Sequence, residues 1–485
     1  MRISDLTAEL PIAFEVIGKQ DTEITGLCTD SRKARGGCLF FCISGLHSDA
    51  HDYAPQAKAA GAAALVVERK LDIDLPQIKV ANVRQALSYI AAAFWGYPAK
   101  KLKIIGITGT KGKTTTSFML RSILLAAGHK VGLIGTVCTL IGDREVESDK
   151  TTPDPIEFQR ILREMADENI EYVVMEVSAH ALDMHRIDGI RFAAAGFTNL
   201  SQDHLDYFGT MDRYLDAKLL IAGMTDKLAV NVDDAVVSRR ASEKNISFRP
   251  VGISERADVY AKDIDITRQG MDFSLTLHKK ATMRINLHMS GLFNVYNSLM
   301  AAALADNVGI GSESIKEGLD ALHNVPGRVE LLDTHTPYRV ILDYAHSPDA
   351  LENVLGTLRQ STARRLIAVF GCGGNRDKLK RPLMGEIGGR LADFSVITSD
   401  NPRDEEPMQI IREIEQGIAG TAHPYIVIEN RREAIKYALR IAECGDTVVL
   451  AGKGHETYQE IKGVKHPFDE KVVVCELLEE LSEEI

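Results

Sequence analysis

The chain has no hydrophobic run long enough to cross a bilayer, and its first residues, Met1-Arg-Ile-Ser-Asp-Leu, contain no apolar signal segment. It also lacks paired cysteines: the seven present form no Cys-x-x-Cys motif and are residues 28, 38, 42, 138, 372, 444 and 475. Unpaired thiols in an odd number are typical of a reducing compartment. We therefore expect a cytoplasmic protein with no transmembrane segment, whose cysteines are reduced and mostly buried.

An excess of positive charge is absent as well. The 57 Lys and Arg residues are outnumbered by 68 Asp and Glu, which gives a net charge of −11. That balance argues against a nucleic-acid partner held by phosphate contacts. Internal repeats and low-complexity tracts are missing too. With 485 residues and 45% hydrophobic content, the chain is expected to fold into roughly three globular domains.

Strand-like and helix-like segments alternate along the chain. In the first hundred residues, apolar runs at 38–43 and 63–67 flank a helical segment at 54–60. A second series has strands at 103–108, 172–176 and 193–198, helices such as 156–168, and a closing helix at 295–305. After a linker at 324–328, strands are expected at 340–342, 366–370, 394–398, 425–428 and 447–450. Such alternation predicts parallel sheets covered by helices, an α/β fold with domains at 1–100, 101–325 and 326–485.

The sequence Gly109-Thr-Lys-Gly-Lys-Thr-Thr-Thr116 lies between the apolar run 104–108 and a helix-like segment at 117–127. A strand, a Gly-rich turn and a helix in this order let backbone N–H groups and the helix N-terminus hold a polyphosphate. Lys113 would then contact the β- and γ-phosphates, and the Thr114 hydroxyl would bind Mg²⁺. Ile107 stands where the usual motif has its first glycine. A flexible Gly/Thr turn and a generic nucleotide switch therefore remain alternatives on this loop alone.

Polar residues also follow two of the other predicted strands. Glu176 ends one strand and precedes Val-Ser178-Ala-His180, while Asp203 and His204 follow the next. A carboxylate at the tip of a parallel strand beside a phosphate loop is placed to reach Mg²⁺. Taken alone, these residues also fit a surface glutamate and a hydrogen-bonding histidine. A Gly-Cys-Gly-Gly turn at 371–374 lacks the last spaced glycine of a dinucleotide fingerprint, which argues against a dehydrogenase.

Together with these segments, further blocks in the same order resemble the Mur ligase family over essentially the whole chain. They are Thr198-Asn-Leu, Tyr214-Leu-Asp-Ala-Lys218, Gly291-Leu-Phe-Asn294-Val-Tyr-Asn297, Gly327-Arg328-Val-Glu330 and Asp343-Tyr-Ala-His346-Ser-Pro348-Asp349. The resemblance implies an N-terminal UDP-binding domain, a central ATPase domain and a C-terminal Rossmann-like domain for the incoming amino acid. It also implies ATP contacts from the phosphate loop and from three later residues, the full set being Gly109, Thr110, Lys111, Gly112, Lys113, Thr114, Thr115, Asn294, Arg328 and Asp343.

The remaining ligand contacts are carried over from the same resemblance. The UDP-sugar peptide is expected at Ser31, Thr151, Thr152, Ser178 and Arg186. The loop Gly45-Leu-His-Ser-Asp49 is expected to touch the nucleotide. Two positions depart from the family pattern: Ala50, just after this loop, and Lys150, just before Thr151. The resemblance implies a carbamylated Lys218, because adding CO₂ to a neutral amine turns it into a carboxylate that can bind a second Mg²⁺. The implied metal ligands are Thr114, Glu176, His204 and this modified Lys218.

Within the family, Asp400-Asn-Pro-Arg403 and Gly452-Lys-Gly-His-Glu456 resemble the members that add meso-diaminopimelate. That amino acid carries a second carboxylate, which lysine lacks, and a planar guanidinium can bind it through two hydrogen bonds. Arg403 is expected in this role. The other expected contacts are Arg376, Asp400, Asn401, Pro402, Gly452 and Glu456, of which Asp400 and Glu456 suit the distal ammonium. Without the family context, the Asp-Asn-Pro-Arg segment also fits a proline turn with a solvated arginine.

The implied reaction is an ATP-dependent ligation in peptidoglycan precursor synthesis. The γ-carboxylate of D-glutamate in UDP-MurNAc-L-Ala-D-Glu becomes an acyl phosphate, which the amine of meso-diaminopimelate then attacks. Lys113, Glu176, His204 and Lys218 are the expected catalytic residues, with two Mg²⁺ ions and a monomeric enzyme. The alternatives are a lysine-adding relative, a folylpolyglutamate-type amide ligase, and a nucleotide-dependent binding protein without ligase activity.

Overall fold

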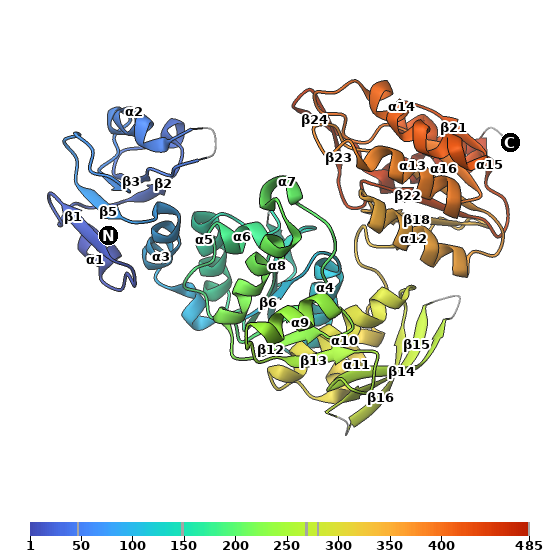
Figure 1. The fold of residues 1–485 in the computed structure, drawn as a ribbon, viewed down its shortest axis with the longest axis horizontal. Helices are drawn as coiled ribbons and strands as arrows, with labels where there is room; N and C mark the ends of the chain where they lie inside the picture. Colours follow the sequence, from blue (N-terminus) through green and yellow to red (C-terminus); the bar gives the residue numbers. More distant parts are fainter. Residues whose placement is uncertain (46–47, 147–149, 267–269, 279–280, 484–485) are drawn as a thin grey trace. The chain divides into compact units, whose positions relative to one another are not determined.

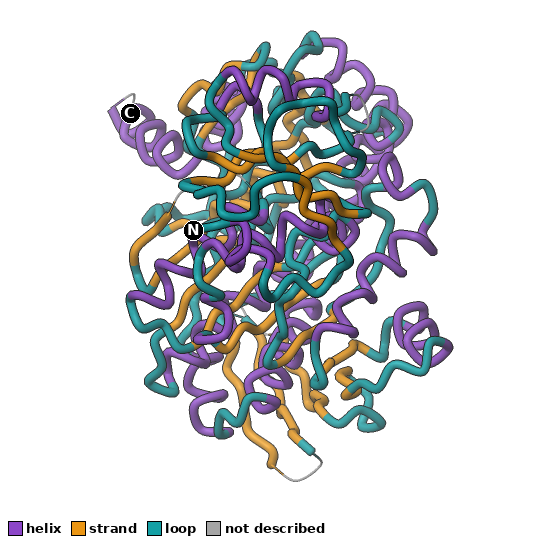
Figure 2. Tube along the Cα trace, turned by 90° about the vertical axis from the view of Figure 1, so that its left-hand side faces the viewer, coloured by secondary structure: helices purple, strands orange, loops and turns teal. Residues whose placement is uncertain are grey.

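The computed structural model describes residues 1–45, 48–146, 150–266, 270–278 and 281–483. Contacts between Cα atoms divide the chain into two compact units. The first comprises residues 1–260, 276–281 and 296–318, and the second comprises 261–275, 282–295 and 319–485. Figure 1 labels the elements, and Figure 2 colours the same chain by helix, strand and loop. In the described residues, no helix is both long and apolar enough to span a membrane.

A five-stranded sheet forms the N-terminal part, in the order β1-β5-β4-β3-β2. Its strands are Phe14–Ile17, Gly26–Cys28, Cys38–Phe41, Ala64–Val67 and Gln77–Val80, and its helices α1 to α3 are Ile3–Thr7, Ala54–Ala59 and Val83–Phe94. Successive strand residues point to opposite faces. Leu39 and Val66 accordingly pack with helix α3, whereas Phe40 and Leu65 pack with helix α2.

The central sheet has eleven strands, in the order β16-β15-β14-β13-β12-β11-β6-β10-β7-β8-β9. Strands β6 to β16 are Lys103–Thr108, Val131–Ile134, Thr139–Ile141, Arg144–Val146, Tyr172–Glu176, Ala194–Phe197, Leu228–Asn231, Arg249–Gly252, Val259–Ile266, Met271–Leu277 and Ala281–Leu287. The accompanying helices α4 to α11 are Lys113–Ala126, Pro155–Asp167, Ala179–Asp183, Leu205–Phe208, Met211–Leu219, Ala235–Glu243, Leu292–Asn307 and Ser312–Asp320.

Strand β6 is paired in parallel with β10 on one side and with β11 on the other. The carboxyl ends of these three strands therefore meet at one edge of the sheet, where ligands bind in open α/β folds. The phosphate loop follows β6, Glu176 is the last residue of β10, and the loop with Asp203 and His204 follows β11. The predicted strands 103–108 and 172–176 are confirmed residue for residue, and this sheet edge collects all three polar segments.

The C-terminal part is built on a six-stranded sheet, in the order β17-β18-β22-β19-β20-β21. Strands β17 to β22 are Glu330–Leu332, Arg339–Asp343, Leu366–Phe370, Phe394–Ile397, Tyr425–Val427 and Thr447–Ala451. Helices α12 to α16 are Pro348–Ser361, Lys380–Leu391, Pro407–Ile418, Arg431–Ile441 and Glu470–Glu483. Helices α12, α13 and α14 pack on one face of this sheet, and α15 and α16 on the other.

A separate two-stranded hairpin, β23 (Tyr458–Ile461) and β24 (Val464–Pro467), precedes the last helix. The three sheets and their helices give the three-domain α/β architecture that the alternating pattern predicted. All five strands predicted at the C-terminal end are right to within one residue at each end, and the largest difference is at 340–342, which is one residue longer at each end in β18.

Candidate active site

The phosphate loop, residues 109–112, is held by the segment that follows strand β11. The backbone N–H of Thr110 donates to the carbonyl of Asn199 at 2.9 Å, and that of Lys111 donates to the Asn199 side chain at 2.9 Å. Gly112 has φ +83°, and a Cβ there would lie 2.3 Å from Oδ1 of Asn297. Only glycine adopts this conformation without strain and leaves this space. The loop is therefore pre-shaped rather than a flexible turn.

Helix α4 begins at Lys113, four residues earlier than the predicted helix-like segment at 117–127. Three consecutive threonines have low intrinsic helix propensity, which masked this start in the sequence. Their side chains are buried in the protein, and tertiary packing outweighs propensity. Lys113 Nζ donates to the carbonyls of Gly109 and Thr110, both at 3.0 Å, so the ammonium lies inside the loop. Thr114 and Thr115 lie in the first turn of the same helix.

Glu176 is almost fully buried at the end of strand β10. Its Oε1 accepts a hydrogen bond from the backbone N–H of Thr136 at 2.9 Å, and Oε2 accepts one from the Thr136 hydroxyl at 3.0 Å. A buried carboxylate with both oxygens held cannot swing to the surface. The alternative of a surface glutamate at a strand end is therefore wrong.

His204 is half exposed and has φ +54°, an uncommon conformation for a histidine. Its ring lies edge-on to that of His180, with the centroids 4.8 Å apart. Burial is the main cause that lowers the pKa of His204, although the neighbouring Asp203 opposes the shift. Burial and the nearby His204 lower the pKa of His180 to about 4. At neutral pH both imidazoles are therefore predominantly neutral, the form that binds metal ions.

Lys218 lies on helix α8 and is only 1% exposed. Its Nζ donates to the carbonyl of Gly109 at 2.7 Å and lies 4.5 Å from the centre of the Tyr214 ring. Burial, followed by the charge of nearby Lys113, lowers the pKa of Lys218 well below that of an ordinary lysine. A lysine on a helix is usually a solvated surface residue. Lys218 is instead a buried, readily deprotonated amine in contact with the phosphate loop.

Among the described residues, no group of three or more His, Cys, Asp or Glu side chains is arranged to hold a metal ion. The expected set contains only one carboxylate, Glu176, and one imidazole, His204, beside the hydroxyl of Thr114. A carboxylated Lys218 would add the second anionic ligand, and a neutral buried amine is the form that can react with CO₂. The donor chemistry therefore fits a hard divalent cation once Lys218 is modified.

Thr152, Ser178 and Arg186, which were predicted to contact the nucleotide-sugar peptide, lie together. The Thr152 hydroxyl donates to the Ser178 hydroxyl at 3.4 Å, and Nη1 of Arg186 donates to the Thr152 carbonyl at 3.2 Å. Thr151 bonds the Thr136 hydroxyl at 3.0 Å. Thr136 also holds Glu176, so this group is linked to the end of strand β10.

Next to these residues is a cavity of about 390 Å³, lined by Arg186, Lys150 and Arg84, with Asp154 among the other residues. Arg84 lies on helix α3 and was not predicted from the sequence; only its position in space reveals it. Lys150, which departs from the family pattern, forms an ion pair with Asp154 at 2.5 Å. These three cations outnumber the two carboxylates of the lining, Asp154 and Glu157, and the excess positive charge suits an anionic ligand.

Ser31 does not line this cavity, and its hydroxyl donates to Oε1 of Gln56 at 2.9 Å. In the loop predicted to touch the nucleotide, residues 46 and 47 lie outside the described residues. His51, just beyond Ala50, is buried and contacts Asp49 with its Nδ1 at 2.6 Å. The Nε2 atom of His51 accepts from the backbone N–H of Glu68 at 3.0 Å. The Asp49–His51 segment is thus fixed by internal hydrogen bonds despite the alanine between them.

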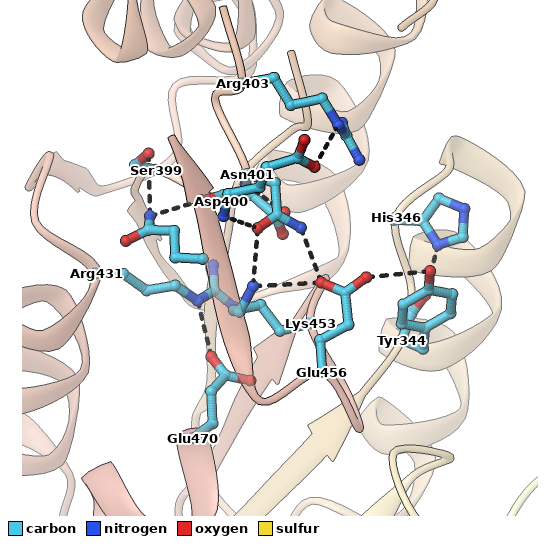
Figure 3. Close-up of polar contacts among 12 residues, drawn as sticks. Tyr344, His346, Ser399, Asp400, Asn401, Arg403, Arg431, Lys453, Glu456 and Glu470 are labelled. Carbon is cyan, nitrogen blue, oxygen red and sulfur yellow. Dashed lines mark hydrogen bonds and ion pairs between the residues drawn. The ribbon is translucent and has the colours of Figure 1, made fainter. Parts of the chain in front are cut away.

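In the C-terminal unit, the segments Asp400–Arg403 and Gly452–Glu456 meet at one polar cluster (Figure 3). The Asn401 side chain donates from Nδ2 to Oε2 of Glu456 at 2.8 Å and accepts at Oδ1 from Lys453 Nζ at 3.1 Å. Lys453 is fully buried and also donates to Glu456 at 3.3 Å. The predicted contact residues Asn401 and Glu456 are therefore held together by a lysine that the sequence did not single out.

Asp400 lies deeper in the same cluster and is 6% exposed. Its Oδ1 accepts from the backbone N–H of Asn401 at 2.6 Å, while its Oδ2 has no hydrogen-bond partner among the described residues. Burial raises the pKa of Asp400, but the charges of Arg431 and Lys453 outweigh burial and leave the pKa lowered. The carboxylate is therefore ionised and compensated from inside the domain.

Arg431 connects this cluster to the last helix. Its Nε donates to Oε1 of Glu470 at 2.8 Å, its Nη2 donates to the carbonyl of Ala451 at 3.0 Å, and neither charged side chain is exposed (Figure 3). Glu470 is the first residue of helix α16. Burial raises the pKa of Glu470 even though Arg431 opposes that shift.

The other predicted residues of this unit are divided between the surface and the interior. Arg376 is exposed, and Pro402 is buried. Asp343 is buried and accepts at Oδ2 from the backbone N–H of Val329 at 2.7 Å. The Arg328 guanidinium lies 5.1 Å from the centre of the Tyr344 ring. Asn294, also buried, donates to the carbonyl of Ser290 at 2.8 Å.

Three segments of the chain match models of domains of one protein family. They are "Mur ligase family, catalytic domain" over residues 23–95, "Mur ligase middle domain" over 107–305 and "Mur ligase, glutamate ligase domain" over 327–454. The chain is 45% identical over 485 residues to UDP-N-acetylmuramoyl-L-alanyl-D-glutamate–2,6-diaminopimelate ligase of Geobacillus thermodenitrificans, with 98% of each chain covered. It is 44% identical over 476 residues to ligase 1 of the same name from Clostridium acetobutylicum, with 97% of this chain and 98% of the relative covered.

A solved structure of a protein with this ligase name superimposes with a TM-score of 0.70 at 31% identity, with 99% of each chain covered. Similarity to the diaminopimelate ligases therefore extends over nearly the whole chain. The chain belongs to the Mur ligase family.

Proposed function

We propose that the protein is the ATP-dependent ligase that joins meso-diaminopimelate to the γ-carboxylate of D-glutamate in UDP-MurNAc-L-Ala-D-Glu, a step of peptidoglycan precursor synthesis in the cytoplasm. The observation that carries this proposal is the similarity to ligases of that name over 97–98% of the chain, together with the Asp400–Arg403 segment. We assign the nucleotide sugar to residues 1–100, ATP to 101–325 and the amino acid to 326–485, in a monomeric enzyme.

ATP is assigned to the phosphate loop, where the N-terminus of helix α4 would face the phosphates. The Lys113 ammonium, now bonded to two loop carbonyls, would bond the β- and γ-phosphates instead. It would stabilise the charge that spreads over the transferring phosphoryl group. Thr110, Lys111, Thr114 and Thr115 complete the loop contacts, and Asn294, Arg328 and Asp343 are proposed as the contacts outside it.

Glu176, His204, Thr114 and carboxylated Lys218 would hold two Mg²⁺ ions, which supply positive charge beside the phosphoryl group and the substrate carboxylate. Thr136 orients Glu176 through both of its oxygens, so the carboxylate is fixed before any ligand arrives. Modification of Lys218 would turn a buried, readily deprotonated amine into an anion in a site that already contains the Lys113 cation. That change explains why a buried amine lies next to the phosphate loop.

The cavity beside Thr152, Ser178 and Arg186 is proposed for the muramoyl dipeptide, with Thr151 as a further contact, and Ser31 is proposed to contact the uridine side of the nucleotide sugar. Arg186 and Lys150 would face its carboxylate or diphosphate groups. The acyl phosphate has a good leaving group, so the amine of the incoming amino acid can attack it at neutral pH. Catalysis then depends on orientation and charge stabilisation rather than on a protein nucleophile.

In the amino-acid site, Arg403 would bind the distal carboxylate and Glu456 the distal ammonium, with Arg376, Asn401, Pro402 and Gly452 around them. The buried Asp400 would add negative charge from beneath the ammonium. Lysine lacks the carboxylate and would add no acceptor for the remaining N–H groups of Arg403, which disfavours it.

The decisive experiment measures ADP and phosphate release with meso-diaminopimelate, its LL and DD isomers, or L-lysine as the acceptor. We expect stoichiometric release only with the nucleotide-sugar dipeptide and an amine present together, and fastest turnover with the meso isomer. Preference for lysine would identify a lysine-adding enzyme. Nucleotide binding without acceptor-dependent release would identify a binding protein and overturn the proposal.

A further inference from the structure

The hairpin β23–β24 is attached directly to the Asp400–Arg403 segment. The backbone N–H of Arg403 donates to the carbonyl of Glu460 at 3.0 Å, and that of Lys462 donates to the carbonyl of Arg403 at 2.8 Å. These bonds form a parallel bridge between Arg403 and Ile461, with Arg403 in the left-handed region at φ +51°. A positive φ is costly for arginine, so the hairpin helps to maintain this conformation.

The same hairpin also holds the Arg403 side chain. Nε of Arg403 donates to Oε2 of Glu460 at 3.0 Å, the ion pair drawn beside Arg403 in Figure 3. On the other side, Nη1 donates to the carbonyl of Gly374 at 2.8 Å. A Cβ at Gly373 would lie 2.9 Å from Nη1, so the turn at 371–374 fits closely around the guanidinium. The plane of the group is therefore fixed from two sides.

This arrangement leaves a defined part of the guanidinium available. Arginine has five N–H donors, and Glu460 and Gly374 each accept from one of them. Among the described residues, none accepts a hydrogen bond from Nη2, and Nη1 retains a second hydrogen. The Arg403 side chain is 23% exposed, so part of it is in reach of a ligand. Two parallel donors on one edge match the two oxygens of a carboxylate.

We propose that Glu460 is a positioning residue that sets the acceptor specificity of the enzyme by holding Arg403 with its terminal edge open. The inference rests on the proposed function and deepens it. A free arginine side chain must lose rotational freedom before it binds a carboxylate, which weakens binding. The bond from Glu460 removes that freedom in advance and uses an N–H that the ligand does not need. Lysine, which has no distal carboxylate, gains nothing from this preorganisation.

The test compares Glu460→Ala, Glu460→Gln and the unchanged enzyme in steady-state ligation assays. For Glu460→Ala we expect KM for meso-diaminopimelate to rise about tenfold, the effect of one long side chain that must now be ordered on binding. Its kcat, and KM for ATP, should change less than about twofold. Glu460→Gln retains an acceptor oxygen for Nε and should recover part of the lost affinity. The preference for meso-diaminopimelate over L-lysine should fall in parallel.

A double substitution separates positioning from general damage. In an Arg403→Ala background, the further change Glu460→Ala should leave KM for meso-diaminopimelate unaltered, because Glu460 acts only through Arg403. Glu480→Ala is the matched control, since Glu480 pairs with Arg432 at 2.6 Å in the same domain, on helix α16. That control should keep all kinetic constants.

Distinct outcomes contradict the inference and the proposed function. If the unchanged enzyme prefers meso-diaminopimelate but Glu460→Ala leaves its KM unchanged or lowers it, Glu460 does not position Arg403. Equal losses in the Arg403→Ala background would have the same meaning. If the unchanged enzyme does not ligate meso-diaminopimelate at all, the proposed function itself is wrong.

Discussion

The buried pair of Arg431 and Glu470 offers a stringent test of how the acceptor cluster is supported. Replacing Glu470 by alanine leaves the guanidinium without its closest carboxylate in a site where neither side chain is exposed. Breaking a buried pair by removing one partner costs about 3–5 kcal/mol. Arg431 would still donate to Ala451 and feel the charge of Asp400, so we expect the lower end, about 3 kcal/mol.

Glu470→Gln should be much milder. It keeps an oxygen that can accept from Nε of Arg431, and burial already raises the pKa of Glu470, which shows how costly its charge is in this site. A loss of about 1 kcal/mol, the scale of one altered hydrogen bond, is expected. The control Glu480→Ala removes partly exposed ion pairs that join the same helix to Arg432 and Lys436, and it should destabilise the domain much less than Glu470→Ala does.

Differential scanning calorimetry of the full chain is a suitable assay. For a domain of this size, each kcal/mol shifts the transition by about 2–4 °C, so Glu470→Ala should lower the C-terminal transition by about 6–12 °C. The transition shift is compared because a multidomain chain does not unfold in two states. A shift below about 2 °C for Glu470→Ala, or equal shifts for the alanine and glutamine variants, would refute the reasoning.

Three further predictions concern the central domain. Lys113→Ala should lower kcat by roughly 100-fold or more, the scale of a lost electrostatic contact, and near-normal turnover would remove the role assigned to the loop. Lys218→Ala should abolish ligation while short carboxylic acids restore part of it, because they replace the carbamate; inactivity without rescue would count against the modification. The third concerns pH. The pKa of His180 is about 4 in the folded protein and about 6.5 for an ordinary histidine, so the unfolded chain binds more protons between these values. Stability should therefore fall as pH decreases from about 6.5 towards 4, and His180→Gln should flatten that part of the Tm-versus-pH curve; an unchanged profile would show that His180 is not the cause.

The strand pattern was predictable because buried parallel strands are short, apolar and bounded by polar turns. Residues 103–108, 172–176 and 366–370 are strands in the structure as predicted. The hairpin β23–β24 was not predicted, since its residues are half-buried to exposed and lack an apolar run. The start of helix α4 was also missed, because threonine disfavours helices locally while burial favours this one.

In the site, too, residues that belong to a local motif were predictable, whereas residues that act through a distant partner were not. The phosphate loop and Glu176 could be predicted because residues adjacent in the sequence indicate their chemistry. Four other residues could not be predicted, because the role of each depends on residues distant in the sequence. They are Arg84, Lys453, Arg431 and Glu470. Glu470, for example, is 39 positions from the arginine it contacts. Charged residues in a helix look solvated until the fold shows that they are buried.

Helix α16 has a consequence for how the protein is handled in the laboratory. Its first residue neutralises Arg431, and its Val473, Val474 and Leu477 fill the core of the C-terminal sheet. A protein truncated before residue 470 would lack both the carboxylate that pairs with Arg431 and the apolar side chains that cover this face of the sheet. Affinity tags at the C-terminal end should therefore be joined to the helix through a linker. Inactivity of variants from which this helix has been deleted would reflect misfolding rather than loss of a catalytic group.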